Sequence, residues 1–117
     1  MKVKYYITED GRKPVKEWQD AFRDNTTKAR IDARITRLRL GNVSGSKSVG
    51  DGVHELVIDF GPGYRIYFAP DGDELILLLY AGAKRRQQDD IDQAKQYWTT
   101  YRQLKVTKTK KNKGQGK

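Results

Sequence analysis

The sequence predicts a small α+β domain in which helices pack on one mostly antiparallel sheet, and three observations support this class. Strand-like segments occur at the start of the chain and again in its middle, and segments with helical periodicity lie between and after them. Short turn-forming stretches join the middle strands, as in a meander. With 117 residues, the chain has room for one modest core. The expected order is strand, helix, helix, three strands, helix.

The first strand and the first helix are expected within the first 22 residues. Residues 2–8 are rich in Val, Tyr and Ile and precede the turn sequence Glu9-Asp10-Gly11, which favours a strand that ends there. Pro14 suits the first turn of a helix. The apolar residues expected on one face of this helix are Val15, Trp18 and Phe22.

A second helix carries two separate stripes of side chains. It is expected to begin at Asn25 or Thr26, either of which can cap it, and to end at Leu40 before Gly41. Its apolar stripe consists of Ile31, Ile35 and Leu38. A row of arginines with the same spacing on another face consists of Arg30, Arg34 and Arg37. This row could bind phosphates, or it could be solvated or paired with acidic groups.

The middle of the chain predicts a loop followed by a meander. Residues 41–52 are rich in Gly and Ser and are expected to form a flexible loop. The three strands that follow are expected over residues 53–60, 64–69 and 74–81. Residues 75–79 have no polar position, which is typical of a central strand covered on both faces.

The last helix is expected over residues 88–104, before a basic tail. Its apolar face would carry Ile91, Ala94, Trp98 and Tyr101. We divide the chain into a domain of residues 1–104 and a tail of residues 105–117, which lacks periodicity and is predicted to be disordered in isolation. The net charge is +9, and residues 93–117 contain eight Lys and Arg and no acidic residue. Such a segment suits a polyanion, although a solubilising role is the alternative.

What the sequence lacks excludes several function classes. The absence of cysteine excludes disulfides, thiolate metal sites and a cysteine nucleophile. The chain has one histidine, His54, no cluster of metal ligands and no Gly-rich phosphate loop, so no metal or cofactor is predicted. No apolar run approaches the ~20 residues of a membrane helix, and the start lacks a signal peptide. We therefore expect a cytoplasmic protein with no membrane contact.

Cationic side chains occur where the predicted strands begin and end. Arg65 lies in the second strand of the meander. The segment directly after the last strand of the meander contains Lys84, Arg85 and Arg86. If neighbouring strands pair, these groups converge at one edge of the sheet. An arginine inside an apolar strand is costly unless it is paired or reaches solvent, so an ion pair with Asp59 or Glu55 is the alternative to a functional role.

Four segments of the sequence resemble a known family. They are residues 52–68, Gly82-Ala83-Lys84, Gln88-Asp89-Asp90-Ile91 and residues 94–98. These segments resemble the RelE/HigB-type toxins of type II toxin–antitoxin systems, and more closely the phage-derived, Gp49-like group of addiction-module killer proteins. The resemblance implies the compact RelE-like fold. It also implies a metal-independent endoribonuclease that cleaves messenger RNA on the translating ribosome and is inhibited by a helix-turn-helix, HigA-like antitoxin.

The same resemblance suggests roles for individual residues. Arg65 matches the strand arginine that stabilises the phosphate in the transition state, and Lys84 matches the basic residue after the last strand. The acid and the base are less defined: His54 alone has an ordinary pKa near neutral, while Tyr97 and Tyr101 lie on a helix where some relatives place a catalytic group. The residues predicted to bind messenger or ribosomal RNA are Arg85, Arg86, Arg30, Arg34, Arg37, Lys108, Lys110 and Lys111.

Two other functions remain open at this point. A non-catalytic module would hold RNA or the ribosome by phosphate contacts alone, through the arginine row and the tail. A ParE-like toxin on the same fold would act on DNA gyrase. The positions that depart from the residues common in the family are Val57, Ala83 and Arg86.

Overall fold

A five-stranded mixed sheet forms the centre of the computed structural model, which describes the backbone of residues 1–115 and the side chains of residues 1–106. The strands are β1 (Lys2–Tyr5), β2 (Ser46–Gly50), β3 (Val53–Ile58), β4 (Tyr64–Asp71) and β5 (Leu75–Ala83). They lie in the order β1-β5-β4-β3-β2. β1 runs parallel to β5, and the other neighbours are antiparallel. The predicted α+β class with a mostly antiparallel sheet is therefore confirmed.

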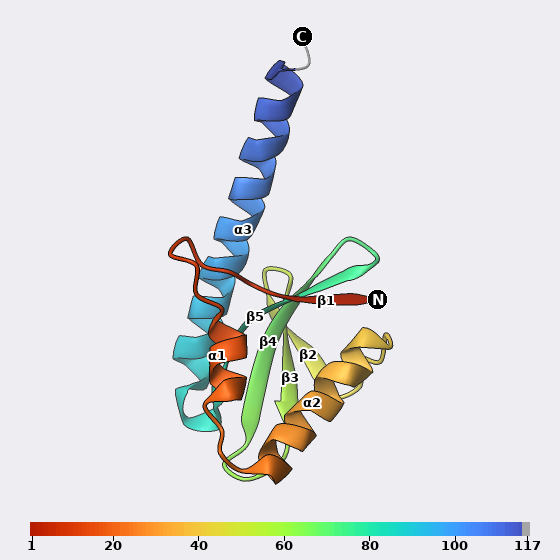
Figure 1. Cartoon of the computed structure of the whole chain (residues 1–117), viewed down its shortest axis with the longest axis vertical. Coiled ribbons are helices and arrows are strands. Elements are labelled where there is room, and N and C mark those ends of the chain that lie inside the picture. Colours follow the sequence, from red (N-terminus) through yellow and green to blue (C-terminus); the bar gives the residue numbers. More distant parts are fainter. Residues whose placement is uncertain (116–117) are drawn as a thin grey trace.

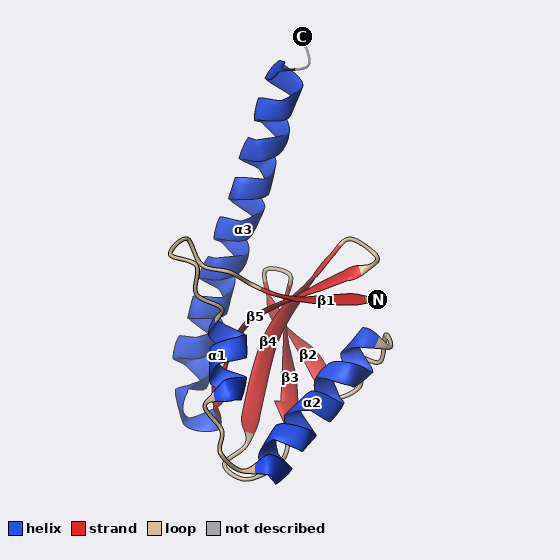
Figure 2. Ribbon diagram, in the orientation of Figure 1, coloured by secondary structure: helices blue, strands red, loops and turns tan. Residues whose placement is uncertain are grey.

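Helices cover both faces of this sheet, which makes three layers (Figure 2). α1 (Pro14–Asp20) and α2 (Asn25–Arg39) pack on one face. The short 3-10 helix η1 (Lys84–Arg86) leads directly into α3 (Gln87–Gln115), which packs on the other face. Figure 1 shows that the carboxyl-terminal half of α3 projects well beyond the sheet. Among the described residues, no helix combines the length and the apolar composition that a bilayer span requires.

The alternation of side chains along β5 builds two hydrophobic cores. Ile76 and Leu78 point into the core beneath α1 and α2, and Leu77 and Leu79 point into the core beneath α3. All four are at most 3% exposed. The prediction that residues 75–79 form a central strand covered on both faces is confirmed, since successive side chains of a strand point to opposite faces.

The start of α2 differs slightly from the prediction. The cap is Asp24, whose carboxylate accepts hydrogen bonds from the backbone N–H groups of Thr26 and Thr27, so neither Asn25 nor Thr26 caps the helix. An aspartate at this position satisfies donors that have no partner within the helix. The predicted apolar stripe is confirmed, because Ile31, Ile35 and Leu38 are all buried.

The predicted flexible loop of residues 41–52 was wrong in part, because it contains the edge strand β2. Asp51 and Gly52 form the tight connection between β2 and β3, with φ angles of 58° and 83°. Positive φ at both central residues is the geometry that Asp-Gly favours in two-residue hairpin turns. The Ser and Gly composition of β2 hid the strand, although the Asp-Gly pair was a signal for it.

α3 continues past the predicted end at Leu104 and reaches Gln115, so the predicted loss of regular structure after that residue was wrong for residues 105–115. Two side-chain contacts extend its docking onto β4: the Tyr101 hydroxyl donates to Asp71 at 2.7 Å, and Lys105 forms an ion pair with Asp71 at 2.9 Å. The sequence that follows has no apolar stripe, so the periodicity of the earlier turns of α3 does not extend to it.

Candidate functional site

Arg65 and Lys84 meet around one backbone carbonyl, that of Gly63. This oxygen accepts a hydrogen bond from the Lys84 backbone N–H at 2.9 Å and one from Arg65 Nη1 at 3.4 Å. Gly63 has a φ angle of 78°, and a Cβ atom there would lie 3.6 Å from Arg65 Nη1. Glycine suits this position because it adopts positive φ without steric cost. The predicted convergence of Arg65 with the segment that begins at Lys84 is therefore found for the Lys84 backbone, while the catalytic role of both residues remains a prediction.

The cations of this site differ in exposure. The Arg65 side chain is only 12% exposed, whereas Lys84, Arg85 and Arg86 are exposed on η1. η1 follows β5 directly, and Lys84 continues the pairing of β5 with the turn before β4. The site thus consists of one fixed guanidinium in the sheet and three accessible cations beside it, an arrangement that suits an anionic ligand approaching from solvent.

A buried carboxylate holds Arg65 from the inner side. Glu55 on β3 is 0% exposed, and its Oε2 lies 3.5 Å from Arg65 Nε. The same Oε2 accepts a hydrogen bond from Gln87 Nε2 at 2.7 Å, and Lys47 Nζ lies 3.8 Å from Oε1. Of the two acids considered from the sequence, Glu55 and not Asp59 pairs with Arg65. The predicted alternative of an ion pair is correct, and it does not compete with a functional role.

Two further polar residues lie on the same face of the sheet. The strand register places Tyr67 opposite Glu55, and burial followed by the charge of Glu55 raises the pKa of the Tyr67 hydroxyl. Asp90, from the first turn of α3, packs against Gly82, where an added Cβ atom would overlap its carboxylate. Burial raises the pKa of Asp90, and the nearby Arg86 opposes this shift.

Three buried side-chain atoms among the described residues lack a hydrogen-bond partner, and all three belong to this cluster. They are Glu55 Oε1, Arg65 Nε and the Tyr67 hydroxyl oxygen. An unsatisfied buried polar atom costs about 1–3 kcal/mol, so such atoms are uncommon in native proteins and call for an explanation. Sequence reasoning missed Tyr67, Gln87 and Asp90. The one available signal was Glu55, an acidic residue inside an apolar strand.

The structure does not bring His54, which was predicted as a catalytic residue, beside Arg65 and Lys84. It pairs with Phe68 across β3 and β4, and the two rings stack with centroids 5.4 Å apart. His54 and Glu55 are adjacent on β3, so they point to opposite faces of the sheet. The Phe68 ring lies in the core beneath α1 and α2, whereas Arg65 and Tyr67 face the α3 side.

The two tyrosines considered on α3 also lie elsewhere. The Tyr97 ring packs against Tyr6 with centroids 4.7 Å apart. Burial raises the pKa of Tyr101 to about 12, and its hydrogen bond to Asp71 adds to the shift. Neither ring contacts Arg65, and both lie at least ten residues along α3 from Gln87, which is about 15 Å at 1.5 Å per residue.

The arginine row of α2 borders the turn between β3 and β4. The Arg30 guanidinium lies 4.3 Å above the Phe60 ring, and Arg34 Nη2 donates to the Ser44 carbonyl at 3.3 Å. Arg30, Arg34 and Arg37 line a cleft of about 240 Å³ with residues 58–60. Burial lowers the pKa of Arg34, and the charge of Arg37 adds to this effect. The turn therefore has the arginine row on one side and Gly63 on the other.

The remaining predicted RNA-binding residues are Lys108, Lys110 and Lys111, whose side chains lie outside the described residues. Their positions fall on the projecting half of α3 (Figure 1). The start of α3 contacts Glu55, so these positions lie at the other end of a 29-residue helix from the Arg65 site. The prediction that they bind RNA is not tested by the structure.

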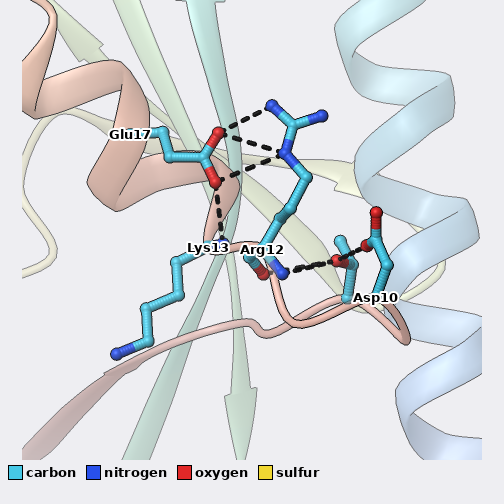
Figure 3. A network of polar contacts seen from close by, with 5 residues as sticks. Asp10, Arg12, Lys13 and Glu17 are labelled. Atoms are coloured by element: carbon cyan, nitrogen blue, oxygen red, sulfur yellow. Dashed lines mark hydrogen bonds and ion pairs between the residues drawn. The ribbon is translucent and has the colours of Figure 1, made fainter.

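A larger cavity lies elsewhere, between α1, α3 and the turn after β1. Its volume is about 720 Å³, and its charged lining consists of Glu9, Asp10, Arg12 and Glu17. Arg12 and Glu17, which line this cavity, form an ion pair at 2.6 Å (Figure 3). Its acidic groups outnumber its one cation, so this cavity does not suit a polyanion.

These features define a small α+β protein with a five-stranded mixed sheet and a cationic site where β4 begins and β5 ends. A protein from Haemophilus influenzae, described only as uncharacterized, is 46% identical to the chain over 78 residues, which is 67% of this chain and 79% of that protein. The chain belongs to the same family as this Haemophilus influenzae protein. No family model matches the chain. No solved structure matches it.

Proposed function

We propose that this protein is the toxin of a type II toxin–antitoxin module, a RelE-like endoribonuclease that cleaves messenger RNA on the translating ribosome and is inhibited by a cognate antitoxin. The observation that carries the proposal is the meeting of Arg65 and Lys84 around the Gly63 carbonyl. The resemblance of residues 52–68 and of the later segments to RelE/HigB-type toxins supports the same function.

The proposed reaction is a transesterification within the RNA strand. The 2′-hydroxyl loses its proton to a base and attacks the adjacent phosphorus, and the bond from phosphorus to the 5′-oxygen breaks. The 5′-oxygen takes a proton from an acid, which leaves a cyclic phosphate and a 5′-hydroxyl. Negative charge grows on the phosphate oxygens during the attack, so a fixed cation at that point lowers the barrier.

Arg65 and Lys84 have complementary roles in this proposal. Arg65 presents a planar guanidinium that suits two oxygens of one phosphate, and its low exposure strengthens the interaction. Lys84 is exposed, its backbone shares the Gly63 carbonyl with Arg65, and its ammonium is the candidate acid for the leaving 5′-oxygen. Since His54 lies on the other face of the sheet, it does not take part.

The RNA would extend from this site over other cations of the surface. Arg85 and Arg86 are exposed next to Lys84 and would hold the substrate or ribosomal RNA. Arg30, with its guanidinium over Phe60, would contact the strand on the far side of the β3–β4 turn. A small helix-turn-helix antitoxin of the HigA type is the proposed inhibitor, and no metal or cofactor takes part in the proposed reaction.

The test is inducible expression in a bacterial host, with growth followed and the 5′ ends of messenger RNA mapped by primer extension. Removing Arg65 altogether would leave the buried Glu55 paired only with the exposed Lys47, so the informative variants are Arg65→Lys, which keeps the charge but loses the planar fork, and Lys84→Ala at an exposed position. We expect wild type to stop growth and to create new 5′ ends within translated messages. Each variant should lower cleavage about 100-fold or more.

The matched control is Arg12→Ala, which removes an exposed arginine that pairs with Glu17 outside the site and should leave growth arrest intact. Full toxicity in both Arg65→Lys and Lys84→Ala would contradict the proposal. Growth arrest without new RNA ends would favour a ParE-like action on DNA gyrase instead. No arrest, with retained ribosome binding, would favour a non-catalytic RNA-binding module.

A further inference from the structure

We propose that Glu55 is a positioning residue, which orients the Arg65 guanidinium so that its outer edge faces an RNA phosphate, and that Gln87 fixes Glu55 to the start of α3. This inference rests on the proposed ribonuclease function for its consequence on rate. The orientation itself rests on contacts of the described side chains alone.

The contacts of Arg65 divide its guanidinium into an inner and an outer edge. Glu55 Oε2 lies 3.5 Å from Nε, and the Gly63 carbonyl accepts from Nη1 at 3.4 Å. Among the described residues, no hydrogen bond or ion pair involves Nη2. A carboxylate placed at Nε therefore leaves donors of both Nη atoms toward Lys84 and solvent, which is the fork that binds a phosphate.

Glu55 is itself held in place from several directions. Its side chain is fully buried, Gln87 donates to Oε2 at 2.7 Å, and Tyr67 lies opposite it on β4. Gln87 is the first residue of α3, so this hydrogen bond joins two strands of the sheet to the helix that covers them. The Arg65 side chain thus rests on a rigid support and not on a loop, which is what accurate positioning needs.

A role for Glu55 as the base is excluded by its burial. A carboxylate at 0% exposure does not reach a 2′-hydroxyl at the surface, so it acts through Arg65. The unpartnered Arg65 Nε fits the same picture, because its distance of 3.5 Å to Glu55 is an ion pair and not a short hydrogen bond. Apo sites often show such long contacts, which shorten when the substrate binds.

The experiment compares Glu55→Gln and Glu55→Asp with wild type, on bacterial ribosomes stalled on a defined messenger RNA. Gln keeps the shape and an acceptor for Gln87 but loses the charge, whereas Asp keeps the charge on a shorter side chain. We expect Glu55→Gln to lower kcat about 10- to 100-fold with KM changed by no more than about twofold, because orientation matters most in the transition state. Glu55→Asp should recover part of the loss.

The matched control is Asp71→Asn, the same loss of charge at an ion-paired carboxylate at the other end of β4. Asp71 is 15% exposed and pairs with Lys105, and its replacement should leave both kcat and KM unchanged. Circular dichroism and thermal unfolding show whether each variant is folded. A folded Glu55→Gln protein with wild-type kcat would overturn the inference.

A second readout separates this inference from the proposed function. The Nε–H signal of Arg65 in a nitrogen-15 NMR spectrum reports its environment whether or not the protein cleaves RNA. We expect that signal to shift and its hydrogen exchange to speed up in Glu55→Gln but not in Asp71→Asn. An unchanged signal would overturn the positioning role. If the signal changes while wild type cleaves no RNA, the ribonuclease proposal fails and the positioning of Arg65 by Glu55 stands.

Discussion

Of two arginine–glutamate ion pairs in this protein, the one with the longer distance matters more for stability. Arg12 and Glu17 approach to 2.6 Å, with side chains 67% and 44% exposed. Arg65 and Glu55 are 3.5 Å apart, with side chains 12% and 0% exposed. Water and salt screen the first pair, so its close contact adds little stability. The second pair is shielded from water, so each charge depends on the other even at the longer distance. Burial, and not distance, therefore decides which of the two pairs matters more for stability.

The two pairs also differ in how completely their polar atoms are hydrogen-bonded. Glu17 also accepts the backbone N–H of Lys13, and hydrogen bonding from Arg12 lowers its pKa, so the exposed carboxylate is well satisfied (Figure 3). The buried pair leaves Glu55 Oε1 and Arg65 Nε without hydrogen-bond partners. The surface network is complete but dispensable, whereas the buried one is incomplete and costly. Unsatisfied groups of this kind are tolerated in native proteins mainly where they serve a function.

The largest expected effect on stability comes from replacing the glutamate of the buried pair by alanine, compared with the same replacement in the exposed pair. We expect Glu55→Ala to lower the free energy of unfolding by about 3 kcal/mol, because it leaves the mostly buried Arg65 charge without its partner. Glu17→Ala should leave the urea midpoint within experimental error, since solvent takes over its role. Urea unfolding of both variants at one salt concentration measures the difference. Equal midpoints would show that burial does not distinguish the two pairs.

A smaller effect is expected at Gly82, which lies opposite Arg65 in the strand register. An added Cβ atom would overlap the Asp90 carboxylate, so Gly82→Ala should destabilise the protein by about 2 kcal/mol, as overpacked cores do. The double variant Gly82→Ala/Asp90→Ala should recover most of this loss, because it removes the overlapping atoms. The control is Gly72→Ala, where no atom lies within 4 Å of an added Cβ atom and only the strain of positive φ remains. A double-mutant cycle that shows no coupling between residues 82 and 90 would contradict the proposed overlap.

The sequence predicted the elements whose pattern is strong and local. The central strand β5 and the stripe of α2 were found because their side chains repeat with the period of one element. β2 was missed because an edge strand has little apolar pattern of its own and depends on pairing with β3 through the Asp51-Gly52 turn. The helical character of residues 105–115 was missed because these residues have no apolar stripe, and the anchor of Lys105 to Asp71 depends on the packing of α3 on the sheet.

The site was predicted in part, for a similar reason. The convergence of Arg65 and Lys84 follows from pairing of consecutive strands, which sequence reasoning can expect. The exclusion of His54 follows from strand parity and register, which fix Arg65 opposite Val57 and hence on the other face from His54. The roles of Gln87 and Asp90 could not be predicted, because only the packing of α3 on the sheet brings them beside Glu55 and Gly82.

The smallest expected effect concerns the pH dependence that Asp90 gives to the buried region. Burial raises the pKa of this carboxyl group, the charge of Arg86 lowers it and Asp89 raises it further. An acid whose pKa is higher in the folded than in the unfolded state contributes stability below its unfolded value, near pH 4, and loses it as the pH rises through the folded value. Asp90 in the ionised form therefore opposes folding, in contrast to Glu17 at the surface, whose lowered pKa has the opposite sign.

Asp90→Asn keeps the shape against Gly82 and removes the titration, so the variant should be more stable than wild type at neutral pH. The gain should shrink as the pH falls toward about 4, because wild-type Asp90 becomes protonated and no longer differs in charge from asparagine. The measurement is the difference between the urea midpoints of the two proteins across this range, in which all other titrating groups cancel. A difference for Asp90→Asn that stays constant with pH would mean that burial does not perturb this carboxylate, and that the buried and exposed acids of the protein behave alike.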